Sequence, residues 1–182
     1  MKKGIQAKLW DGKQFRVGWL TYDKGVIDKI SFRKPSPKRA ADLHDLGERC
    51  VMPGFVDTLL HGYGGVDCGE GTPARLHKMT MLLASTGVTT ALAGFYPTTS
   101  DGLQKAARNW NKWSTMRGAR THIAGWHIEG PFVARNMSGA LPKAAMRKPS
   151  VKAAQELVDA CGGWLSMATL APERSEEHTS EL

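Results

Sequence analysis

The sequence has 182 residues, of which 41% are hydrophobic and 23% are charged, and its formal net charge is +8. This composition is typical of a soluble globular protein. No apolar stretch approaches the ~20 residues that a membrane helix needs, and no apolar run follows the basic start of the chain, as it would in a signal peptide. We therefore expect a cytoplasmic protein without a membrane partner.

The cysteines and the basic residues exclude further classes. The three cysteines are widely spaced, which fits reduced thiols better than a disulfide framework. The basic residues are spread along the chain apart from a cluster at residues 33–39, where two prolines predict a stiff, solvated loop. Because no nucleic-acid-reading motif accompanies the charge, we expect no nucleic-acid partner.

The last residues, 174–182, differ from all that precede them. This segment holds three glutamates and a single aliphatic residue. We interpret it as a non-native tail of the kind that read-through of a sequencing adapter produces, and we exclude it from the fold. A natural acidic tail is the alternative.

The first 49 residues predict a small β domain. The β-prone runs 5–10, 15–22 and 26–32 are separated by the turn signals Asp11-Gly12 and Lys24-Gly25. We expect these strands to form part of a small β-sandwich that precedes the rest of the chain.

From residue 50 to 173 the pattern changes to alternating strands and helices. Apolar runs at 51–60, 88–96, 121–128 and 164–170 predict buried strands. Helices are expected between them, with Thr72, Ser100 and Ser150 as N-caps. Repeated β/α units with apolar strands predict a parallel sheet, either open and doubly wound or part of a barrel. Four β/α units in about 120 residues have the number of residues per unit of a TIM-like (β/α)₈ barrel of ~250 residues. We therefore expect an α/β fold containing the first half of a barrel.

Candidate functional residues follow the ends of these strands, where a barrel places its chemistry. Glu129 ends the third strand before Gly-Pro, and burying it unpaired would be costly. A divalent metal would compensate its charge, and pairing with a nearby arginine or lysine is the alternative.

His61 ends the first strand before a glycine-rich loop at residues 62–65. It can be a metal ligand, a substrate ligand or a hydrogen-bonded strand-end histidine. The loop lacks a phosphate-binding fingerprint, and glycines such as Gly62 can let the backbone approach a ligand.

Asp57 lies within the first strand, where its carboxylate can hydrogen-bond to neighbouring backbone or orient a histidine. His127 points to the same side as Glu129, and it can reach the site or fill the barrel interior.

Several of these segments resemble a known family. Met-Pro-Gly-Phe-Val-Asp at 52–57, with His61-Gly62, resembles the first-strand signature of the amidohydrolase superfamily. His-Ile-Glu-Gly-Pro-Phe at 127–132 and Thr-Leu-Ala-Pro-Glu at 169–173, together with the segments at 87–90 and 96–99, resemble the N-acetylglucosamine-6-phosphate deacetylases more specifically.

The resemblance implies hydrolysis of the acetamide of a phosphorylated N-acetyl amino sugar, with release of acetate. By position Glu129 would bind a divalent metal ion, zinc or iron, with His61 as a less certain ligand, and Gly62, Ala140 and Leu141 would contact substrate. The family's acid/base aspartate and two histidine ligands are expected beyond residue 173. No catalytic residue is thus expected within the chain, and residues 1–173 alone are expected to be inactive. The full-length protein is expected to be a homo-oligomer.

Two positions depart from the family pattern. Many relatives have histidine where this chain has Leu59, and relatives usually have histidine at the position of Leu141. A leucine cannot bind a metal ion, which favours one metal over two. Three readings therefore stay open: this deacetylase, an amidohydrolase for another acetylated amino sugar or amide, and a catalytically inactive binding relative.

Overall fold

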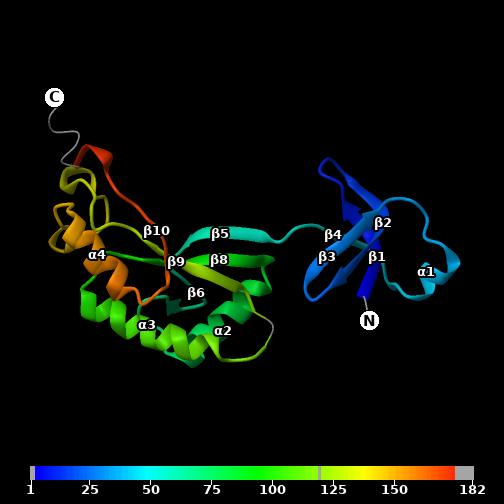
Figure 1. Ribbon diagram of the computed structural model, residues 1–182, viewed down its shortest axis with the longest axis horizontal. Helices are drawn as coiled ribbons and strands as arrows, with labels where there is room; N and C mark the ends of the chain where they lie inside the picture. The colour runs from blue at the N-terminus through cyan, green and yellow to red at the C-terminus, as the bar shows by residue number, and fades with distance from the viewer. Residues whose placement is uncertain (1–2, 119, 175–182) are drawn as a thin grey trace. The chain divides into compact units, whose positions relative to one another are not determined.

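The computed structural model describes residues 3–118 and 120–174, and the chain forms two compact units, Met1–Pro53 and Gly54–Leu182 (Figure 1). The division falls after Pro53, whereas the sequence placed it between residues 49 and 50, inside the last strand of the first unit. Each unit has its own sheet, and each is described by itself.

The first unit is built on one mixed sheet. Its strands are β1 (Lys3–Trp10), β2 (Phe15–Asp23), β3 (Val26–Ser31) and β4 (His44–Val51), in the order β3-β2-β1-β4. The first two pairings are antiparallel, while β1 and β4 run parallel. Asp11 fixes the β1–β2 turn because its carboxylate accepts hydrogen bonds from the backbone N–H groups of Lys13 and Gln14. The described residues of this unit hold a single sheet, so the expected sandwich is not confirmed.

Two features of the first unit differ from the expectation. Part of the basic segment is helical: α1 (Pro37–Ala41) begins after Ser36, whose hydroxyl accepts from the backbone N–H of Arg39. The apolar run 51–60 is not one strand. Val51 ends β4, where it pairs with Leu9, and the next strand begins only at Phe55. Pro53, between the two strands, has no N–H to donate to a ladder.

The second unit contains the predicted parallel sheet. Its strands are β5 (Phe55–Leu60), β8 (Val88–Phe95), β9 (His122–Ile128) and β10 (Leu165–Ala168). They pair in the order β10-β9-β8-β5, and every pairing is parallel. Consecutive strands are thus neighbours, without the reversal of order that a doubly wound sheet shows.

Shorter elements and helices connect these strands. A small hairpin, β6 (Gly62–Tyr63) with β7 (Val66–Asp67), follows β5. The helices are α2 (Pro73–Ala84), α3 (Ser100–Ser114) and α4 (Val151–Ala160). Single 3₁₀ turns span Arg135–Met137, Lys143–Ala145 and Pro172–Arg174. None of the described helices is long and apolar enough to cross a membrane.

The helix starts follow the expected capping chemistry with one shift. The hydroxyls of Thr72 and Ser150 accept backbone N–H groups in the first turns of α2 and α4. At α3 the cap is Thr99, which accepts from the N–H of Gly102 at 3.2 Å, and Ser100 is already the first helical residue. Adjacent Thr and Ser are both good caps, so the pattern alone could not separate them.

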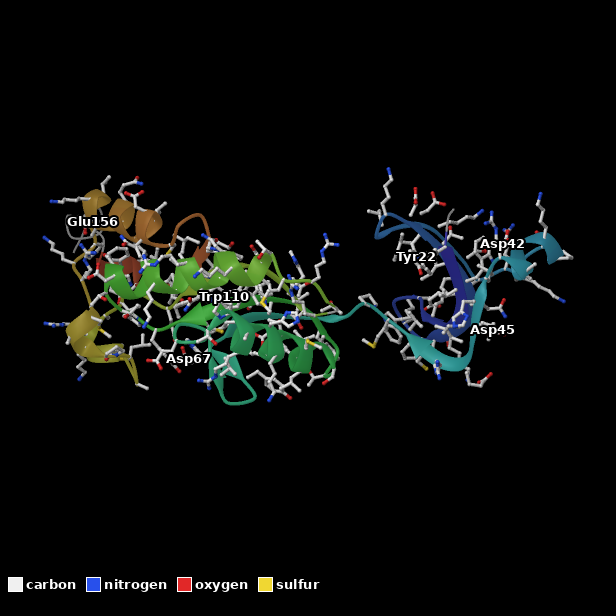
Figure 2. All side chains as sticks on the ribbon, turned by 90° about the horizontal axis from the view of Figure 1, so that it is seen from below. Tyr22, Asp42, Asp45, Asp67, Trp110 and Glu156 are labelled. Carbon is white, nitrogen blue, oxygen red and sulfur yellow. The ribbon has the colours of Figure 1, made fainter. Side chains whose placement is uncertain are left out.

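The three helices lie side by side along one face of the sheet (Figure 1). The core lies between them and the strands, and Figure 2 shows Trp110 in this interior. Trp110 is fully buried and donates its indole N–H to the carbonyl of Cys68 at 2.9 Å. Trp113 is also buried and bonds the hydroxyl of Thr80. The tryptophans of α3 therefore belong to the core.

Candidate functional site

The strand ends of the second unit place a set of side chains on the sheet face that the helices leave uncovered. Alternate residues of a strand point to opposite faces. The residues buried toward the helices are Leu60, Ala93, Phe95, Trp126 and Ile128. The residues that alternate with them at the carboxyl ends are Leu59, His61, Gly94, Tyr96, His127 and Glu129. Both strongest candidates, His61 and Glu129, belong to this second set.

The structure brings His61 and Glu129 into direct contact. His61 follows β5 and Glu129 follows β9, and the His61 Nε2 atom lies 3.1 Å from Glu129 Oε2. The backbone places the glutamate because its N–H donates to the carbonyl of Phe95, at the end of β8, at 2.9 Å. The side chains of His61 and Glu129 are 24% and 27% exposed, so the pair is partly shielded yet open to a ligand.

The His61 ring has two further neighbours, the Tyr96 ring and the backbone at Gly94. The ring of Tyr96 lies flat against it, with centroids 3.9 Å apart and planes 4° apart. Its Nδ1 atom is buried and has no hydrogen-bond partner within residues 3–118 and 120–174. A Cβ atom added at Gly94 would lie 3.2 Å from this Nδ1, so the imidazole rests on the β8 backbone at a position without a side chain.

His127 does not join the pair. Its Nδ1 lies 2.8 Å from the carbonyl oxygen of Thr58, and its Nε2 lies 2.8 Å from the hydroxyl of Thr169. A carbonyl only accepts, so Nδ1 carries the proton, and in the neutral ring Nε2 accepts from the hydroxyl. Asp57 also has a backbone role, accepting from the N–H of Leu59 at 3.0 Å. The structure therefore supports a role for the His127 side chain in the interior of the fold, and not beside Glu129 in the site.

A cavity of about 490 Å³ opens beside the pair. Its lining includes His61 and Glu129 with the loop residues Ala140 and Leu141, which brings four of the five predicted site residues together. Gly62 is not among the lining residues. A Cβ atom there would lie 2.2 Å from the carbonyl oxygen of Val66, so the β6–β7 hairpin itself explains this glycine.

The cavity also contains residues that sequence reasoning did not single out for a role. Tyr96 forms part of the wall, as do Val133, Met137 and Thr169. Tyr96 directly follows the carboxyl end of β8, so the rule that found Glu129 could have found it. The loop residues Val133 and Met137 carry no such signal, because their position depends on how the chain folds between β9 and α4.

The donors fit part of a metal site. Two ligand atoms that share a tetrahedral zinc ion, each about 2.0–2.1 Å from it, lie about 3.3 Å apart. The observed 3.1 Å between His61 Nε2 and Glu129 Oε2 is close to this span, and imidazole with carboxylate suits zinc or iron. Groups of three or more His, Cys, Asp or Glu side chains able to hold a metal are absent from the described residues. The pair is therefore compatible with half of a four-ligand set.

Comparison with known proteins gives a consistent set of relatives. No family model matches the chain. The N-acetylglucosamine-6-phosphate deacetylase of Bacillus subtilis is 27% identical over 175 residues, covering 93% of this chain and 44% of the relative. The human protein of the same name is 29% identical over 178 residues, covering 93% and 42%. The N-acetylgalactosamine-6-phosphate deacetylase of Escherichia coli O157:H7 is 26% identical, covering 86% and 41%.

A solved structure is similar to this chain as well. A mutant N-acetyl-D-glucosamine-6-phosphate deacetylase from Mycobacterium smegmatis, in complex with N-acetyl-D-glucosamine-6-phosphate, superimposes with a TM-score of 0.72 at 28% identity, covering 96% of this chain and 44% of that one. The chain thus spans less than half the length of the curated relatives and of this solved structure. In sequence and in fold, the chain is similar to the amino-terminal part of the N-acetylglucosamine-6-phosphate deacetylases.

Proposed function

We propose that this chain contributes part of the active site of a metal-dependent deacetylase that acts on N-acetylglucosamine-6-phosphate. The observation that carries the proposal is the contact of His61 Nε2 with Glu129 Oε2 at the carboxyl edge of a parallel sheet. This edge is where barrel enzymes hold their reacting groups. The relatives that match along most of the chain support the reaction, and the sequential strand order supports a half barrel.

In this proposal Glu129 and His61 supply two ligands of a divalent metal ion. The metal would activate a water molecule and polarise the acetamide carbonyl. The cavity beside the pair would receive the acetamide, with Ala140 and Leu141 against the sugar. Further ligands and the group that moves the proton would come from outside the described residues, so residues 1–173 alone would be inactive.

N-acetylgalactosamine-6-phosphate is a second candidate substrate, and Leu141 is the residue that bears on the choice. Leu141 lines the cavity at a position where relatives usually have histidine. The imidazole of a histidine would offer a hydrogen-bond donor and an acceptor. A leucine offers neither, so the position contributes shape rather than a polar contact to the choice of sugar. The match to an N-acetylgalactosamine-6-phosphate deacetylase makes that sugar phosphate the second candidate.

The test is acetate release by the complete polypeptide that contains this chain, after loading with zinc or iron(II). N-acetylglucosamine-6-phosphate, N-acetylgalactosamine-6-phosphate and unphosphorylated N-acetylglucosamine are compared at equal concentration. We expect release from the first substrate, with the unphosphorylated sugar much poorer. Faster release from the second would transfer the assignment to it. A folded, metal-loaded protein that releases no acetate from any of them would contradict the proposal and leave a binding role.

A further inference from the structure

The proposed metal site does not by itself explain what fixes the direction of the His61 ring. A metal-binding histidine usually donates its second ring N–H to a carboxylate, a carbonyl or a water molecule, and this bond fixes the direction of the ring. In the described part of the chain the Nδ1 of His61 has no such partner. Asp57, four residues earlier, binds the Leu59 N–H. Within the described residues, the Nδ1 side of the ring is therefore held by packing contacts and not by a hydrogen bond.

Tyr96 is the residue placed to do so. Its ring is parallel to the His61 ring within 4°, and the centroids are 3.9 Å apart. The backbone at Gly94, two residues earlier on the same strand, supports the Nδ1 edge of the imidazole. Glu129 lies at the Nε2 edge. With one face and two edges in contact, rotation of the His61 side chain about its bonds would disturb the stack.

Tyr96 also lies at the surface, between two cavities, where a residue that only fills the core would not lie. It is 48% exposed. It lines the cavity beside the His61–Glu129 pair, and also a neighbouring cavity of about 610 Å³ that includes Thr98 and Lys105. An aromatic side chain left half exposed between two cavities contributes little to the core, so packing alone does not account for it.

We propose that Tyr96 is a positioning residue, which holds the His61 imidazole by ring stacking so that Nε2 points toward Glu129. The role belongs to the ring and not to the hydroxyl, because the stack uses the ring face. The inference concerns the geometry of this chain's own residues, and it rests on the proposed function only for its effect on turnover.

The first test reads the histidine directly, in the metal-free complete protein. Nuclear magnetic resonance of the imidazole groups, assigned with a His61→Gln variant, should show contacts between His61 and Tyr96 ring protons in the unchanged protein. It should also show His61 proton shifts displaced upfield by the stacked ring. The displacement should persist in Tyr96→Phe and disappear in Tyr96→Leu. Tyr63→Leu is the matched control, because Tyr63 is 40% exposed and is not among the residues lining either cavity.

The second test separates positioning from binding. In Tyr96→Leu, kcat should fall by roughly three- to tenfold, which is the scale of an aromatic pair interaction, with KM changed less than about twofold. Tyr96→Phe should restore kcat.

Three results would overturn the proposal: no contact between the two rings in the unchanged protein, His61 signals unaltered in a folded Tyr96→Leu, or Tyr96→Phe as impaired as Tyr96→Leu. If the protein proves to have no deacetylase activity, the resonance measurements still decide the role of Tyr96. If Tyr96→Leu does not fold, the contacts in the unchanged protein and the Phe variant remain decisive.

Discussion

The two residues at the centre of the site are 68 positions apart in the sequence, yet their side chains meet at 3.1 Å. Each could be named from local sequence, because each follows an apolar run that predicts a strand. Their meeting required only that the strands be parallel and close in order, since parallel strands end at the same edge. What local sequence could not give was the setting of His61: the stacked Tyr96 ring and the glycine beneath Nδ1 depend on the register of β5 against β8.

The cysteines allow a prediction at the residue scale. Burial raises the pKa of the Cys68 thiol to about 12 and that of Cys161 to about 11. A thiol reacts through its thiolate, so both should stay protonated and inert at pH 8, while the exposed Cys50 reacts. Titration of the native protein with a disulfide reagent should therefore modify Cys50 quickly and the other two only on unfolding. Rapid native labelling of Cys68 would contradict the structure.

The same shifts fix the sign of a pH effect. The folded state keeps these two protons above the ordinary thiol pKa of 9.0, at which the unfolded chain begins to lose them. Unfolding then releases protons, so the contribution of these thiols to the free energy of unfolding should be constant below about pH 9 and fall as the pH rises from 9 towards 11 and 12. Denaturant melts between pH 8 and 11 measure this. A stability that rises over that range would contradict the assignment.

At the scale of elements, strands and helices were predictable where one face is buried. The runs that became β8 and β9 alternate with helices that have clear caps, and burial on the helix side made their pattern apolar. The sequence missed β4, whose residues are mostly exposed, and it joined Val51 to the next strand. Neither the local pattern nor the turn chemistry of residues 44–51 marks them as a strand, because the strand exists through its pairing with β1.

His127 supports a prediction at this scale. Its register partner on β8 is Gly94, and its imidazole reaches Thr58 on β5, beyond β8, while also bonding Thr169 after β10. One side chain thus joins three segments. Replacement by leucine would remove two part-buried hydrogen bonds, each worth about 0.5–1.5 kcal/mol, which should lower the free energy of unfolding by about 1–3 kcal/mol.

The control lies on the same strand. His122 begins β9 and is exposed, so His122→Leu should change the free energy of unfolding by less than about 0.5 kcal/mol. Chemical denaturation of both variants measures the difference. Equal effects of the two substitutions would show that the His127 bonds do not stabilise the sheet.

At the scale of the whole molecule, the second unit leaves much of its sheet uncovered. Within the described residues β5 and β10 each have one neighbouring strand. Apolar side chains remain exposed on and beside these edge strands, with Phe55 at 59%, Val56 at 66% and Leu170 at 57%. Unpaired strand edges favour pairing with other chains. We therefore expect the 182-residue chain by itself to associate as its concentration rises.

Lysine on an edge strand opposes such pairing, so Val56→Lys should reduce the association that sedimentation velocity detects. Val158→Lys is the matched control, because Val158 is also exposed, at 47%, but lies on helix α4. The control should associate like the unchanged chain. A monomeric chain at all concentrations, or an equal effect of both substitutions, would contradict an edge-mediated contact.

We propose that His61 and Glu129 bind a metal ion together, and the zinc affinity of the complete protein measures this. Glu129→Gln removes a charged ligand while keeping the side-chain shape, and Glu156→Gln, at an exposed carboxylate paired with Arg147 on the outer surface (Figure 2), is the control. We expect Glu129→Gln to weaken zinc binding at least about tenfold, and Glu156→Gln to leave it unchanged. Equal zinc affinity in the unchanged protein and in Glu129→Gln would show that Glu129 is not a metal ligand.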